Sequence, residues 1–156
     1  MSQNQAVEHQ YDAIRKSFEE QSDVYNQMYV GSESTILIEN RQLRECIGEQ
    51  ISLLYEWEGL AAITHANARR AEALVDQVYG LVFKKEMSGR GKAPSTTEAK
   101  AYAQSNDDYV RVKQLHNNTI RLRDEVDAVL NTIKARQYAL KDLTNALVAG
   151  VESHVI

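Results

Sequence analysis

The basic residues are the side chains whose type and spacing could bind a charged ligand. Four of them fall among the nine positions from Lys84 to Lys92, namely Lys84, Lys85, Arg90 and Lys92. Arg69 and Arg70 precede this group by about four helical turns. Such a row could line a path for a polyanionic backbone, with the amides of Gly89 and Gly91 as further donors. The spacing alone is equally consistent with a loop whose charge only keeps the protein soluble.

A second candidate group lies near the end of the chain, where a tyrosine could add ring stacking to positive charge. Its members are Lys134, Arg136, Tyr138 and Lys141. Any of the four bases could stack on the Tyr138 ring, so such a contact would not depend on the base sequence. Arg136 falls on the apolar seam of its segment, so the alternative is that these long side chains pack along a bundle edge and extend only their charged heads into water.

Patterns for catalysis or metal binding are weak. Gly89-Arg90-Gly91-Lys92 has the form of the end of a phosphate loop, but Glu86 stands where that motif needs glycine and Ala93 where it needs serine or threonine. The four histidines lie far apart and show no metal-ligand spacing. We therefore expect no enzymatic activity, no cofactor and no metal.

Length and composition limit the architecture and the compartment. The chain has 156 residues, enough for one ordinary domain, and its single cysteine, Cys46, excludes an internal disulfide. It contains no apolar run long enough for a membrane span and no basic-then-apolar leader. We expect a cytoplasmic protein.

The net charge of −4 is distributed unevenly. Residues 1 to 40 hold two basic and seven acidic residues, a net charge of −5. Residues 41 to 92 hold eight basic and seven acidic residues, a net charge of +1. An acidic N-terminal segment argues against non-specific anion binding by the whole surface. Any anion site must therefore be local.

The elements that position these residues are predicted to be long helices. A Gly-x-Gly followed by the only proline, Pro94, breaks a helix, so the chain must turn between two long apolar-striped segments. The first has a heptad seam from Leu43 to Val82, with small residues such as Ala68 in its middle. The second begins after Ser105-Asn106-Asp107-Asp108, a capping box, and ends at Gly150. The fold class is predicted to be all-α, an elongated antiparallel helical hairpin with coiled-coil-like seams.

We expect two regions along the chain. Residues 1–35 form an acidic amphipathic helix, ending at Gly31, and a linker, while residues 36–156 form the helical hairpin for DNA binding and oligomerisation. The N-terminal helix is expected to pack, the alternative being a mobile arm. The seam of the last helix is wide enough for more than one neighbour. Its oligomerisation residues are predicted to be Leu122, Val126, Val129, Ile133, Leu140 and Leu143.

Several of these patterns together resemble the UvsY-type recombination mediators of tailed phages. The resemblance rests on Ile38-Glu39 with Leu43, on Leu54-Tyr55 with Trp57, on the Ser88-Gly89-Arg90-Gly91 turn, on Asp107-Asp108, and on the segment from Ile133 to Lys141. It spans roughly residues 36 to 145 and leaves the N-terminal helix uncovered.

The resemblance implies a ring-shaped homo-oligomer, for which a heptamer is one candidate, that binds single-stranded DNA. Its partners would be a single-strand-binding protein, which it helps to displace, and a RecA-like recombinase, whose filament it loads and stabilises in phage homologous recombination. A phage virion assembly or scaffold protein with coiled-coil oligomerisation is the alternative. Salt-sensitive single-strand binding favours the mediator, whereas polymerisation without DNA favours the scaffold.

Overall fold

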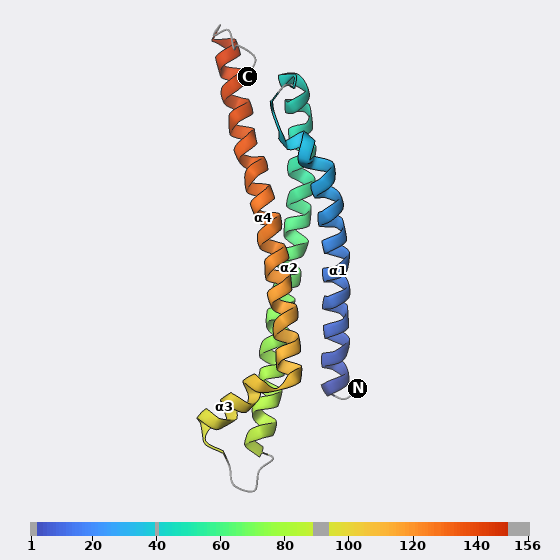
Figure 1. Ribbon diagram of the computed structural model, residues 1–156, viewed down its shortest axis with the longest axis vertical. Coiled ribbons are helices and arrows are strands. Elements are labelled where there is room, and N and C mark those ends of the chain that lie inside the picture. The colour runs from blue at the N-terminus through green and yellow to red at the C-terminus, as the bar shows by residue number, and fades with distance from the viewer. Residues whose placement is uncertain (1–2, 40, 89–93, 150–156) are drawn as a thin grey trace. The chain divides into compact units, whose positions relative to one another are not determined.

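Four helices account for nearly all of the described chain in the computed structural model (Figure 1), which describes residues 3–39, 41–88 and 94–149. The helices are α1 (Gln3–Ile36), α2 (Leu43–Ser88), α3 (Thr96–Ser105) and α4 (Asp107–Val148). The described residues contain no strand, so the predicted all-α class is confirmed. No helix among these ranges is long and apolar enough to cross a membrane.

The chain divides into two compact units, each built from parts of the three long helices. Unit 1 comprises residues 1–20 and 64–122, and unit 2 comprises residues 21–63 and 123–156. Within each unit α1 and α4 run in one direction and α2 runs in the other (Figure 1). The predicted division into 1–35 and 36–156 stays a prediction.

The core of unit 1 joins the first turns of α1 to α2 and α4. Its buried apolar residues are Ile14, Ala71, Leu74, Val75, Val78, Val112 and Leu115. The ring of Tyr79 on α2 contacts that of Tyr109 on α4, with centroids 5.7 Å apart. Asn67 donates from Nδ2 to the carbonyl oxygen of Ile14 at 3.4 Å. The beginning of α1 therefore packs as part of this unit, as expected, and is not an unattached arm.

The core of unit 2 is centred on Trp57, which is fully buried. The ring of Tyr25 on α1 meets the indole edge-on, with centroids 5.9 Å apart. From α4, Val126 and Ile133 are also fully buried. Burying large apolar groups of this kind is the main source of stability in a helical unit.

Two local details, the end of α1 and the cap of α4, differ from the sequence predictions. α1 continues five residues beyond Gly31, because Ser32 is buried and its hydroxyl donates to the carbonyl oxygen of Met28 at 2.6 Å. α2 passes without a break through its glycines, where long-range packing offsets their low helix propensity. The cap of α4 is Asn106, whose Oδ1 accepts from the Asp108 amide at 3.0 Å, while the Ser105 hydroxyl donates to Tyr102 instead.

α3 begins with a capping box. The Ser95 hydroxyl accepts from the Glu98 amide at 3.2 Å, and the Glu98 carboxylate accepts from the Ser95 amide at 2.9 Å. The predicted cap at Asn40 lies outside the described residues.

Candidate nucleic-acid interface

Four of the predicted binding residues lie together on one side of α2 in unit 1. We call Arg69, Arg70, Lys84 and Lys85 the α2 basic face, and all four are exposed. Successive helical residues are rotated by about 100°, so these four fall within roughly half of the helix circumference. The structure records no ion pair for any of them among the described residues. Their charges are therefore available to a ligand.

No acidic residue lies inside the arc of α2 from Arg69 to Lys85. Between Arg70 and Lys84, the same rotation places Ala73, Gln77 and Gly80 on the basic side. It places Asp76 about 20° and Glu72 about 60° beyond Arg69, at the edge of this side, and Glu86 farther round the circumference. A phosphate approaching the α2 basic face thus meets cations separated by small or neutral side chains.

A groove runs beside the α2 basic face in unit 1. It has a volume of about 400 Å³ and is lined from α1 by Gln10, Ala13 and Ile14 and from α2 by Arg70, Ala73, Leu74 and Gln77. No lining residue is acidic. The Arg70 guanidinium can therefore meet an anion beside amide donors from both helices.

Lys84 and Lys85 lie in the last turns of α2. There the Ser88 hydroxyl donates to the carbonyl oxygens of Lys84 at 2.9 Å and Lys85 at 3.3 Å. Cations in the last turns also interact favourably with the negative end of the helix dipole. The predicted contacts Arg90 and Lys92 lie outside the described residues.

Charge is segregated between the two units. Unit 1 contains 12 basic and 10 acidic residues, a net charge of +2, and unit 2 contains 6 basic and 12 acidic residues, a net charge of −6. The α2 basic face belongs to the unit with the positive net charge, which is where a local anion site is expected.

The second predicted group belongs to unit 2 and is not a single surface. Tyr138 is 70% exposed and Lys141 is exposed, whereas Lys134 lies 3.7 Å from the carboxylate of Glu58. Arg136 is 4% exposed. Its Nη1 donates to the carbonyl oxygen of Cys46 at 3.1 Å, so Arg136 holds α4 to α2 and was wrongly predicted to contact DNA.

The predicted oligomerisation seam of α4 is already covered by the chain's own helices. Leu122, Val126, Ile133 and Leu140 are buried, and Val129 and Leu143 are half-buried. A side chain packed inside one chain cannot also face another copy. Leu122, Val126, Ile133 and Leu140 therefore do not fit a subunit interface, whereas the assignment of the half-buried Val129 and Leu143 stays a prediction.

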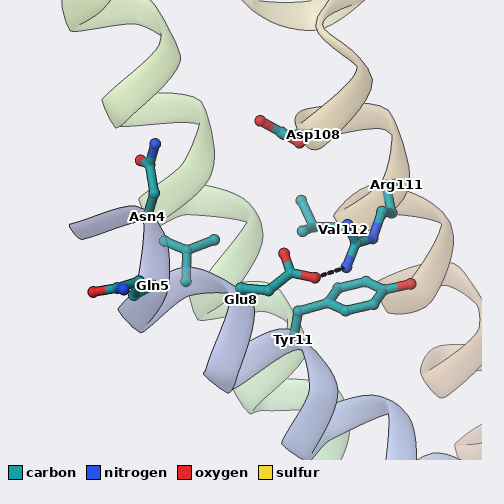
Figure 2. A pocket seen from close by; sticks show the side chains of 8 residues that line it. Asn4, Gln5, Glu8, Tyr11, Asp108, Arg111 and Val112 are labelled. Atoms are coloured by element: carbon teal, nitrogen blue, oxygen red, sulfur yellow. Dashed lines mark hydrogen bonds and ion pairs between the residues drawn. The ribbon is translucent and has the colours of Figure 1, made fainter. Parts of the chain in front are cut away.

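Figure 2 shows a polar contact in unit 1 that the sequence did not reveal. Arg111 on α4 donates from Nη2 to the Glu8 carboxylate on α1 at 2.6 Å. Its guanidinium also lies 3.8 Å from the centroid of the Tyr11 ring. The hydrogen bond to Glu8 raises the pKa of Arg111, so this clamp keeps its positive charge. No local pattern could pair residues so far apart in the chain.

The described residues offer little to bond-making chemistry. They contain no group of three or more histidine, cysteine, aspartate or glutamate side chains placed to hold a metal ion. The thiol of Cys46 is buried. Comparison of the chain with protein-family models, curated proteins and solved structures found no match.

Proposed function

We propose that this chain is a non-enzymatic recombination mediator that binds single-stranded DNA through the α2 basic face. The observation that carries the proposal is that Arg69, Arg70, Lys84 and Lys85 are exposed on one side of α2, and that the arc they span contains no acidic residue. Cations arranged in this way neutralise phosphates and release counterions, which is the main source of sequence-independent affinity.

The charge distribution favours DNA binding at one surface of unit 1 over non-specific binding across the whole protein. The positive unit attracts the DNA backbone, while the negative charge of unit 2 opposes non-specific binding elsewhere. No base-reading motif accompanies the cations, so binding should tolerate any base sequence. A mediator needs this property because it must act wherever single strands are exposed.

The remaining parts of the proposal rest on the resemblance to UvsY-type mediators. The protein would weaken the hold of a single-strand-binding protein on DNA and help to load a RecA-like recombinase. It would do so as a ring-shaped oligomer of elongated helical hairpins, in which repeated α2 basic faces contact one strand. Because the α4 seam is packed within the chain, such a ring would need other contact surfaces.

Titration of fluorescent oligo-dT at several salt concentrations tests the proposal. The logarithm of the affinity should fall with the logarithm of the salt concentration, by about 0.7 for each phosphate contact on a single strand. Absence of binding at low salt would refute the proposal. Polymerisation that does not require DNA, together with absence of binding, would favour a virion scaffold.

A further inference from the structure

The first turns of α2, all in unit 2, carry large apolar side chains that face solvent. Ile47, Ile51 and Tyr55 recur every four residues, and their exposed fractions are 44%, 77% and 80%. Residues four apart lie one above the other on a helix surface, so these three form a continuous strip. A row of large apolar side chains exposed on one helix side is typical of a surface that binds another protein.

Two opposite charges extend the strip at its ends. Arg44 lies three residues before Ile47, and Glu58 lies three residues after Tyr55. Arg44 is exposed, and the structure records no ion pair for it among the described residues. Glu58 makes a contact of 3.7 Å with Lys134, and both side chains are about half exposed. The surface therefore runs from a cation through three apolar residues to an anion.

This order is symmetric about Ile51. Ile47 and Tyr55 lie four residues on either side of it, and Arg44 and Glu58 lie seven residues on either side. We propose that the strip binds a second copy of this chain in antiparallel orientation, across a twofold axis at Ile51. Each Ile47 then lies level with Tyr55 of the second copy, and each Arg44 lies level with Glu58 of the second copy.

The packing geometry suits a close contact. Rows of residues four apart interdigitate when two helices cross at about 50°, the most frequent class of helix packing in globular proteins. Gly48 and Gly59 flank the strip, and a Cβ added at either would contact nothing. These positions leave room for the side chains of the second copy. The contact is self-complementary, as a twofold interface requires.

The charge of this region argues against DNA as the occupant, since unit 2 has a net charge of −6. The inference does not depend on the proposed DNA-binding function, because the strip and the α2 basic face belong to different units. A twofold contact closes with two copies, so it does not build a ring by itself. The short strip predicts a dimer that dissociates on dilution.

Sedimentation velocity over a range of protein concentrations tests this dimer. Ile51→Asp should raise the dimer dissociation constant at least about tenfold, because it places a charge at the centre of an apolar contact. Its thermal unfolding should match that of the unmodified chain at concentrations low enough for both to be monomeric, since Ile51 is exposed. Val30→Asp is the matched control, because Val30 is 74% exposed on α1 of the same unit, and it should leave the dimer intact.

Exchanging the charges of Arg44 and Glu58 tests whether the two copies pair in the antiparallel register. Arg44→Glu alone should weaken the dimer, because it places two carboxylates level with each other at both ends of the contact. Adding Glu58→Arg to that variant should restore dimerisation. The proposal is overturned if the unmodified chain stays monomeric at every concentration, if Ile51→Asp dimerises normally, or if the double exchange is no better than the single one.

Discussion

Arg136 and Gln50 form a reciprocal bridge between α4 and α2 in unit 2. Arg136 donates from Nη1 to Oε1 of Gln50 at 2.5 Å, and Gln50 donates from Nε2 to the carbonyl oxygen of Ile133 at 2.9 Å. The second guanidinium nitrogen of Arg136 lies 3.8 Å from the Glu49 carboxylate. A buried cation is thus held by a carbonyl, an amide and a nearby carboxylate.

Replacing Arg136 should therefore affect stability and leave DNA affinity unchanged. Arg136→Ala leaves Oε1 of the buried Gln50 without its donor and removes the second donor to the Cys46 carbonyl, and it should cost about 3 kcal/mol of unfolding free energy in urea titrations. Lys134→Ala, on the same helix but half exposed, should cost less than about 1 kcal/mol. Equal losses in the two variants would contradict the assignment of Arg136 to the core.

The small side chain of Ala68 is required by packing within unit 1. Ala68 is 4% exposed, so Ala68→Leu should overpack the space between helices and lower the unfolding free energy by about 1 to 3 kcal/mol. Ala66 is exposed two residues earlier, and Ala66→Leu should change stability by no more than about 0.5 kcal/mol. Thermal unfolding followed by circular dichroism compares the pair. A harmless Ala68→Leu would mean that no helix packs against this position.

The attachment of α1 to unit 1 should depend on its apolar side and much less on the clamp in Figure 2. Ile14→Ala removes a residue that is 5% exposed and should cost about 3 kcal/mol. Glu8→Gln breaks an ion pair between partly exposed side chains and should cost less than about 1 kcal/mol. Urea unfolding with hydrogen exchange of residues 3–20 would measure both. The prediction would be contradicted if residues 3–20 lost more hydrogen-exchange protection in Glu8→Gln than in Ile14→Ala.

Glu49 should contribute to stability in a pH-dependent way. Its hydrogen bond from Arg41, at 2.6 Å, holds the pKa of the carboxyl below its ordinary value of 4.5. The folded chain therefore binds this proton less readily than the unfolded chain does. The resulting stabilisation is present above pH 4.5 and is lost as the pH falls through the lowered folded pKa.

Glu49→Gln should accordingly be less stable than the unmodified chain at pH 7, and the difference should shrink as the pH falls below 4.5. Urea titrations between pH 7 and strongly acidic conditions would show this convergence. Glu56→Gln provides the control, because Glu56 is exposed and no ion pair is recorded for it among the described residues. A difference that stays constant over the whole pH range would exclude the proposed linkage.

The inner faces of the helices were predictable, because apolar spacing over many turns is a strong local signal. The seam of α4 from Val112 to Leu140 and the positions of Ile14 and Trp57 followed from it. What each face packs against was not predictable. Six seam residues of α4 were assigned to a subunit interface, and four of them are buried within the chain itself.

The first turns of α2 show why apolar spacing does not identify the partner of each helix face. Apolar residues occur on two sides of the helix there, with Cys46 and Trp57 buried on one side and Ile51 and Tyr55 exposed on the other. Periodicity placed Ile47 on the inner seam, but it is 44% exposed. Arg136 was misplaced for the converse reason, since its polarity suggested solvent while its partners came from 86 and 90 residues away.

The most direct test of the central claim compares two variants that each lose two exposed lysines and therefore change the net charge equally. Lys84→Ala with Lys85→Ala removes half of the α2 basic face, and Lys134→Ala with Lys141→Ala removes lysines from unit 2. Oligo-dT affinity would be measured for both at several salt concentrations. We expect weaker binding only in the variant that lacks Lys84 and Lys85. Its slope of log affinity against log salt concentration should be smaller by about 0.7 for each lost phosphate contact. Unaltered affinity and slope in the first variant, or an equal loss in both, would contradict DNA binding by the α2 basic face.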